Sequence, residues 1–170
     1  MRNAEHDEQC TRCEQVPLAR VALDLLGSGQ AVRFVARGRS MRPFVRDGDV
    51  LTIEPVAKAC PRRGDIVFYA TPDGAAAHRL LAIRREGDRR MALTRGDVTG
   101  LWTETVEWAD LCGTVVAVHR GGRRVLRRTA LERLTGLSWA RARGLFVRFR
   151  LAGSRVKRVL RGQWPVISDR

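Results

Sequence analysis

Short runs in which apolar and polar residues alternate fill the middle of the chain. Alternation with a period of two places the apolar side chains on one face of a β-strand. Turn-forming sequences such as Asp-Gly, Arg-Gly-Asp and Pro-Asp-Gly separate the runs, which favours antiparallel pairing of neighbouring strands. The pattern predicts strands over residues 31–37, 49–56, 65–70, 76–85, 89–95, 113–120 and 123–128.

Apolar residues at helical spacing replace this alternation towards the two ends. Between Pro17 and Gly27 they predict a short helix, and from Thr129 onward they are interleaved with arginines. The fold class predicted is therefore mainly β (α+β), with an antiparallel sheet. We expect three parts: a polar segment with a short helix over 1–29, a β domain over 30–128, and a basic amphipathic helical tail over 129–170.

Most of the net charge lies in the C-terminal part of the chain. Residues 119–170 hold 15 of the 32 Lys and Arg but only two acids, Glu132 and Asp169, and so carry +13 of the net +14. Such a segment can bind anionic lipid, an acidic protein partner or nucleic acid, or pack on the domain as a solvated helix. Aromatic residues among the arginines favour a membrane surface over nucleic acid; they are Trp139, Phe146, Phe149 and Trp164.

Cysteine usage and hydropathy exclude several classes of protein. Cys10 and Cys13 are spaced as one half of a zinc site, with His6 nearby, but no second pair of ligands follows. We therefore expect reduced thiols, no metal and no cofactor. The N-terminus is polar and acidic rather than a secretory signal, and the longest apolar run, LCGTVVAV, is too short to span a bilayer. We expect a cytoplasmic protein, peripheral to a membrane if the tail binds lipid.

The segment after the first predicted strand places one small hydroxyl among arginines. It reads GRSMRPFVRDGDV over residues 38–50. A serine is a poor nucleophile unless a neighbouring base takes its proton, so the candidate Ser40 needs a partner. The only lysines are Lys58, in a connector, and Lys157, in the tail. His78 follows small apolar residues and opens a hydrophobic strand, which favours it as the base, although a histidine in this setting is also common in cores.

Five elements along the chain occur in the order GRSMRPFVRDGD, RRGDIVFY, HRLLAI, LTRGD and CGTVVAV. Over about residues 31–120 they resemble the signal peptidase I superfamily, which also includes the LexA-type self-cleaving repressors. Most bacterial members use a lysine where this chain has His78. The substitution is similar to the archaeal and endoplasmic-reticulum type of signal peptidase, which pairs serine with histidine. The resemblance implies a serine endopeptidase that cleaves a peptide or precursor protein through a Ser-His dyad.

The resemblance also assigns individual residues. Ser40 is implied as the nucleophile, with its backbone N–H in the oxyanion hole, because Gly38 stands where many bacterial members carry an additional serine hydroxyl. A histidine base usually needs a carboxylate to orient it. The stretch LTRGDVTG is similar to the Thr-Lys-Gly-Asp motif of the histidine-type enzymes, so we favour Asp97 as the third member and take Glu104 as the second choice. A structural turn aspartate is the alternative at Asp97.

Substrate binding is expected on the apolar strand before the serine. Val32, Phe34, Val35 and Met41 are predicted to line a shallow groove that takes an extended peptide as an added strand. Two other functions fit the same motifs: a LexA-type self-cleaving regulator, and a catalytically silent member that binds peptides. The missing lysine and the short segment before the β domain speak against the first, and the incomplete aspartate motif keeps the second open.

Overall fold

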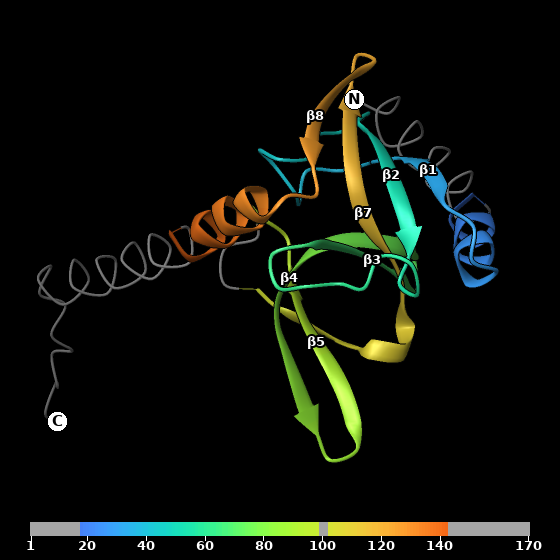
Figure 1. Ribbon diagram of the computed structural model, residues 1–170, viewed down its shortest axis with the longest axis vertical. Helices are drawn as coiled ribbons and strands as arrows, with labels where there is room; N and C mark the ends of the chain where they lie inside the picture. Colours follow the sequence, from blue (N-terminus) through green and yellow to red (C-terminus); the bar gives the residue numbers. More distant parts are fainter. Residues whose placement is uncertain (1–17, 99–101, 143–170) are drawn as a thin grey trace, which may run out of the picture.

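The computed structural model describes residues 18–98 and 102–142. This part of the chain is mainly antiparallel β-sheet with a helix towards each end (Figure 1), which confirms the predicted mainly β (α+β) class. The candidate metal ligands His6, Cys10 and Cys13 lie outside the described residues, as does the tail beyond residue 142.

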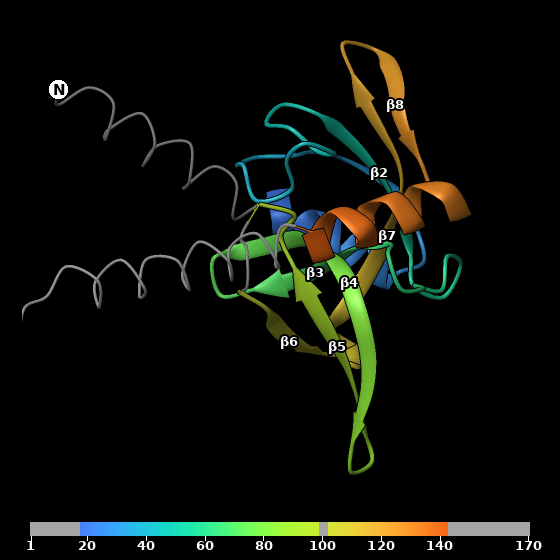
Figure 2. The same ribbon diagram turned by 90° about the vertical axis from the view of Figure 1, so that its left-hand side faces the viewer.

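Eight strands form one antiparallel sheet in the described part of the chain. Their order is β1-β2-β7-β3-β4-β5-β6, and β8 pairs with β7 outside this path. All seven predicted strands are present, and the β4–β5 hairpin extends beyond the rest of the sheet (Figure 2). The strands are β1 (Val32–Val35), β2 (Val50–Pro55), β3 (Ile66–Thr71), β4 (Gly74–Glu86), β5 (Arg89–Arg95), β6 (Glu104–Glu107), β7 (Leu111–Arg120) and β8 (Arg123–Arg127).

Strand β3 lies in the middle of the sheet and is buried on both faces. Ile66 and Phe68 pack in one core cluster, together with the helix over residues 18–27, whereas Val67 and Tyr69 pack in a second cluster on the opposite face. This burial on both faces explains why the sequence of β3 is continuously apolar rather than alternating. The second cluster carries the Tyr69 hydroxyl group into the interior.

Strand β6 was not among the predicted strands. Its sequence is Glu-Thr-Val-Glu, with Val106 as the only apolar residue, so no alternation can be recognised. The segment forms a strand because it pairs along four residues with β5, the strand that precedes it. This pairing sets Glu104 directly opposite Thr94.

The helix over residues 130–142 packs on the β domain (Figures 1 and 2). Ala140 is buried, and its carbonyl accepts a hydrogen bond from the Arg95 side chain. Gly136 lies against the guanidinium of Arg79, where an added Cβ would overlap the guanidinium atoms. The described part of the predicted tail is therefore in contact with the β domain across the predicted boundary between them.

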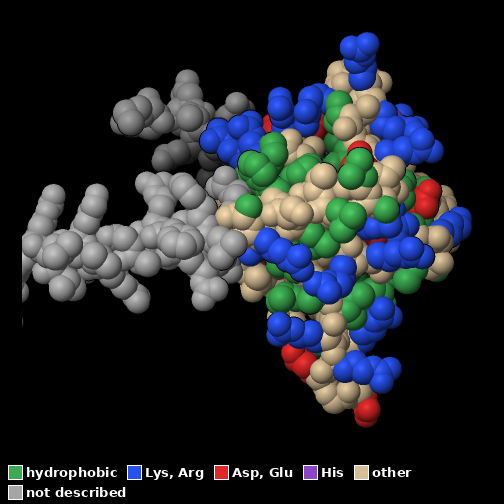
Figure 3. Space-filling model, turned by 60° about the vertical axis from the view of Figure 1, so that its left-hand side comes forward, with side chains coloured by type: hydrophobic (Ala, Val, Ile, Leu, Met, Phe, Trp, Pro, Cys, Tyr) green, Lys and Arg blue, Asp and Glu red, His purple; other side chains and the backbone are tan. Residues whose placement is uncertain are grey.

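The surface of the molecule is rich in basic side chains. Lys and Arg are spread over the face shown in Figure 3, where few acidic side chains are visible. On the C-terminal helix, Leu131 and Leu134 are largely exposed. No helix of the described residues is both long and apolar enough to cross a membrane.

Candidate active site

Ser40 lies in a turn between β1 and β2 that is held from several sides. The N–H of Arg42 donates to the carbonyl of Arg39 at 3.2 Å, which closes the turn around the serine. The carbonyl of Ser40 accepts a hydrogen bond from the N–H of Val98 at 2.8 Å. The next side chain, Met41, is buried in the first core cluster and anchors the turn. The hydroxyl group is thus presented from a fixed backbone.

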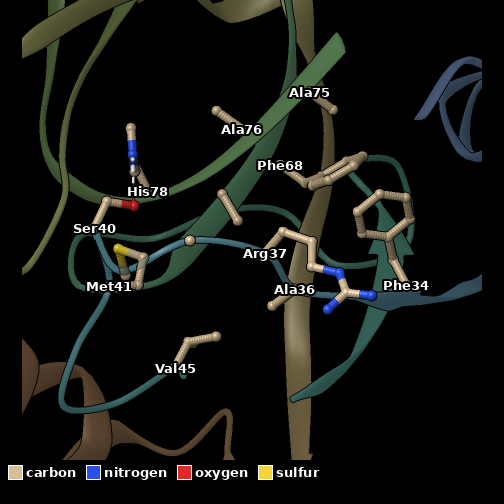
Figure 4. A pocket seen from close by; sticks show the side chains of 12 residues that line it. Phe34, Ala36, Arg37, Ser40, Met41, Val45, Phe68, Ala75, Ala76 and His78 are labelled. Carbon is tan, nitrogen blue, oxygen red and sulfur yellow. Dashed lines mark hydrogen bonds between the residues drawn. The ribbon is translucent and has the colours of Figure 1, made fainter. Parts of the chain in front are cut away.

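His78 lies on β4, and its side chain reaches the serine. The distance from His78 Nε2 to Ser40 Oγ is 3.3 Å (Figure 4), within hydrogen-bond reach. In the register of the sheet, His78 is paired with Val67 of β3, and Tyr69 lies diagonally across from it on the same face. The two residues predicted as nucleophile and base are therefore brought together.

The other nitrogen of His78 contacts a tyrosine and a carboxylate. His78 Nδ1 lies 2.8 Å from the hydroxyl of Tyr69 and 3.4 Å from Oε2 of Glu104. The Tyr69 hydroxyl donates to the same Glu104 oxygen at 2.5 Å and lies 3.3 Å from Oγ1 of Thr94. Four adjacent strands, β3 to β6, thus contribute one residue each to a polar network behind the imidazole.

The protons of this network fix the tautomer of the imidazole. Burial, followed by the hydrogen bond to Glu104, raises the pKa of Tyr69, so the phenol remains neutral at physiological pH. Its single O–H group donates a hydrogen bond to Glu104, which leaves the phenol oxygen to accept a hydrogen bond from the N–H at His78 Nδ1. The network therefore places the imidazole proton on Nδ1 and leaves Nε2 as the basic nitrogen facing Ser40.

Asp97, the favoured third member, is engaged elsewhere. Its two carboxylate oxygens accept hydrogen bonds from Nε and Nη2 of Arg79 at 2.7 and 2.6 Å, and both side chains are buried. Arg79 follows His78 on β4, so its side chain points to the opposite face of the strand. The order of the two candidates is therefore corrected: Glu104, and not Asp97, supplies the carboxylate at Nδ1 of His78.

A pocket of about 180 Å³ opens beside the serine and histidine (Figure 4). Phe34 and Met41 line it, as predicted, but Val32 and Val35 do not. Val32 is buried in the first core cluster. Val35 is 45% exposed because successive side chains of β1 alternate between faces, and only Phe34 faces the pocket. The placement of Val35 in the groove is therefore corrected. The remaining walls are Ala36, Arg37, Gly38, Val45, Phe68 and Ala75–Ala77, with Ser40 and His78 at one end.

Backbone donors near the serine differ in their availability. The N–H of Gly38 donates to Oδ1 of Asp47 at 2.9 Å, so it is occupied. Among the described residues, no acceptor contacts the N–H of Ser40. This donor is therefore not engaged by another described group of the protein, as a donor to an anionic oxygen must not be.

Tyr69 is the site residue that sequence reasoning missed. It is the single tyrosine of the chain, within an apolar run that reads as a buried strand. A usable signal was the Pro-Asp-Gly turn, because pairing the strands on either side of it places Tyr69 and His78 on one face.

Comparison of the chain with protein-family models and with curated proteins gave no match. Within residues 18–98 and 102–142, no group of three or more His, Cys, Asp or Glu side chains is arranged to hold a metal ion. The geometry of the site brings together a hydroxyl group, an imidazole held at both nitrogens and an adjoining pocket.

Proposed function

We propose that the chain is a serine endopeptidase of the signal peptidase type, with Ser40 as nucleophile and His78 as base. The observation that carries this proposal is the double contact of the imidazole. One nitrogen faces the Ser40 hydroxyl at 3.3 Å, and the other is held by Tyr69 and Glu104. A nucleophile, its base and a group that orients the base form the minimal unit for nucleophilic catalysis by serine.

In the first half of the reaction, His78 Nε2 takes the proton of Ser40 as Oγ attacks the carbonyl carbon of the scissile peptide bond. The N–H of Ser40 stabilises the negative charge that develops on the carbonyl oxygen. The imidazolium then donates its proton to the leaving amine, and the C–N bond breaks to give an ester on Ser40. Glu104 stabilises the charged imidazole, directly and through Tyr69.

In the second half, water takes the place of the leaving amine. His78 removes a proton from this water, which attacks the ester carbonyl, and the protonated imidazole returns its proton to Ser40 Oγ. The products are a new carboxyl terminus and the free serine. Both halves require the same tautomer of His78 at their start, and Tyr69 and Glu104 hold that tautomer.

An extended substrate fits along β4 beside the pocket. In the described residues, β4 pairs with β3 from Gly74 to Arg79, but with β5 only from Arg79 onward. Among the described residues, Ala75–Ala77 therefore have no strand partner on the β5 side, and this edge can pair with a peptide strand that passes Ser40. The small side chains of Ala75–Ala77 leave room in the pocket, and we expect small residues next to the scissile bond.

The test is cleavage of a peptide library by the full chain, read by mass spectrometry. Ser40→Ala and His78→Ala should each abolish cleavage while the fold remains, because nucleophile and base act as a unit. Ser28→Ala removes an exposed hydroxyl group and serves as the matched control. Lys58→Ala should leave activity unchanged. An inactive Lys58 variant beside an active His78 variant would disprove the choice of base.

The same experiment distinguishes the two alternative functions. A self-cleaving regulator would cut its own chain at a rate independent of protein concentration, and would leave added peptides intact. A silent member would bind peptides but cleave none. We favour cleavage of a separate peptide because the pocket adjoins Ser40 and because, within the described residues, Ala75–Ala77 of β4 have no partner strand on the β5 side.

We also propose that the basic tail attaches the enzyme peripherally to an anionic membrane surface. The support is the +13 charge of residues 119–170, of which the tail itself (residues 129–170) carries +8, together with its interspersed aromatics and the exposed Leu131 and Leu134. The full chain should sediment with anionic vesicles and not with neutral ones, and raised salt should weaken the binding. A gel shift with duplex DNA in the absence of vesicle binding would contradict the proposal.

A further inference from the structure

The pocket beside Ser40 contains one permanently charged side chain, that of Arg37. Among the described residues that line the pocket, the others are apolar, apart from Gly38, Ser40 and His78. Figure 4 shows the Arg37 side chain reaching along the pocket towards Phe34, at the end away from the serine. A cation in an otherwise apolar pocket selects for an anion on the ligand that enters it.

Arg37 is only loosely held by the protein's own acids. Its nearest carboxylate is that of Asp47, 3.8 Å from Nη1, and the two side chains are 50% and 51% exposed. Asp47 is itself engaged, because its Oδ1 accepts the N–H of Gly38. An exposed ion pair at this distance contributes little free energy. The guanidinium therefore keeps donors available for a second carboxylate, which it can bind in a bidentate manner.

The segment around the serine carries further positive charge of the same kind. Between residues 33 and 46 there is no acid, while exposed arginines occur at positions 33, 37, 39, 42 and 46. Asp49, the next acid after Asp47, is buried and accepts two hydrogen bonds from Arg120. These arginines add to the net positive charge of the protein, which favours association with anionic peptides.

We infer that the enzyme prefers acidic peptides, and that Arg37 binds an Asp or Glu side chain of the substrate within the pocket. This inference rests on the proposed peptidase function and names its substrate class. In an extended peptide, side chains on one face recur every second residue, about 7 Å apart. Because Arg37 points away from Ser40, the acidic residue lies two or four positions from the residue at the scissile bond.

The experiment measures peptide binding without cleavage. The full chain carrying Ser40→Ala is titrated into fluorescent peptides with amidated C-termini, and binding is read by fluorescence anisotropy. The peptides are matched pairs with Glu or Gln at each of four positions on either side of a central Ala-Ala bond. At the preferred position we expect about tenfold tighter binding of the Glu peptide, the size of one charge-assisted hydrogen bond.

Two variants locate this preference. Arg37→Gln should remove the difference between the Glu and Gln peptides. Arg84→Gln also removes one positive charge, but it lies six residues beyond His78 on β4, about 20 Å away, so the preference should remain. Pairs with a free C-terminus in place of the amide test whether the terminal carboxylate can replace the side chain.

The outcomes separate this inference from the proposed function. Equal binding of all Glu and Gln pairs would overturn the inference, as would a preference that persists in Arg37→Gln. A preference that disappears equally in Arg84→Gln would assign it to the overall charge and not to the pocket. If the matched pairs behave as expected but the active chain cleaves none of them, the binding site stands and the peptidase proposal fails.

Discussion

Two neighbouring residues of β4, His78 and Arg79, each meet a carboxylate, and the two pairs differ sharply. On one face, His78 Nδ1 lies 3.4 Å from Glu104, whose side chain is 41% exposed. On the other face, Arg79 binds Asp97 through two hydrogen bonds of 2.6 and 2.7 Å, and these side chains are 3% and 0% exposed. The His78–Glu104 pair is loose and partly exposed, whereas the Arg79–Asp97 pair is tight and buried.

The buried Arg79–Asp97 pair is called the clamp here because it joins several segments of the chain. Besides Asp97, Arg79 donates from Nη1 to the carbonyl of Gly64 at 2.7 Å, and it lies over the ring of Phe44. Arginine stays protonated, so no proton moves within this pair. The residue after Asp97, Val98, donates its N–H to the carbonyl of Ser40. The clamp therefore supports the turn that carries Ser40, the proposed nucleophile, while the looser pair belongs to the proposed catalytic site.

The largest change in stability is expected when the buried charge of Asp97 is removed. We expect Asp97→Asn to lower the free energy of unfolding by about 3–5 kcal/mol, because the buried charge of Arg79 loses its partner. Chemical denaturation measures this change. Glu107→Gln, which removes an exposed partner of Arg89, is the control and should cost less than about 1 kcal/mol.

If Asp97→Asn does not fold, the double variant Arg79→Met/Asp97→Leu keeps the prediction testable. An apolar pair of similar volume should restore folding, since neither charge is then left buried alone. Equal stability of Asp97→Asn and the parent chain would refute the clamp.

The second prediction concerns the carboxylate on the open face. Glu104→Gln should lower kcat/KM for peptide cleavage by about 100-fold, because the charged imidazole loses its counter-ion while hydrogen bonding to Tyr69 persists. Its free energy of unfolding should stay within about 0.5 kcal/mol of the parent value. Glu107→Gln, the same change on the same strand, should keep full activity. If Glu104→Gln lowered stability but not activity, the His78–Glu104 pair would be structural and the prediction would be wrong.

The third prediction probes the helix that covers the clamp. Gly136→Ala should lower the free energy of unfolding by about 1–3 kcal/mol, because a Cβ at this position would overlap the guanidinium of Arg79. Ser138→Ala, at an exposed position of the same helix, is the control and should be neutral or slightly stabilising. Equal melting temperatures of the two variants would show that the helix does not pack on Arg79.

The smallest effect concerns the hydroxyl group that joins Glu104 to His78. Tyr69→Phe keeps the buried ring and should lower kcat/KM by about tenfold, with an altered pH profile, because the tautomer of His78 is less well fixed. In the double variant Tyr69→Phe/Glu104→Gln the two losses should not add, since both act on one nitrogen. Additive losses, or an unchanged pH profile, would leave Tyr69 with a structural function only.

The sequence predicted the sheet more fully than the site. Seven strands are visible as local alternation or apolar runs, and Ser40 and His78 follow from local motifs and the scarcity of other bases. The choice between Asp97 and Glu104 depended on contacts between distant segments. Asp97 fits the motif, but its carboxylate is bound by Arg79. Glu104 lies on β6, whose single apolar residue gives no periodic pattern that could predict a strand. Val35 lies outside the pocket because the alternation of β1 turns its side chain to the face opposite Phe34.

The packing of the helix over residues 130–142 has a consequence for how the protein is made. Arg79 is covered by a helix that leaves the ribosome only after the strands have been synthesised, since Ser40 precedes Ala140 by 100 residues in the chain. At about 5–20 residues per second, this interval is about 5–20 s. During that time Ser40 has been synthesised, but the Arg79–Asp97 pair behind its turn is not yet covered by the helix. The burial of this charged pair is therefore completed only after the C-terminal helix has been made.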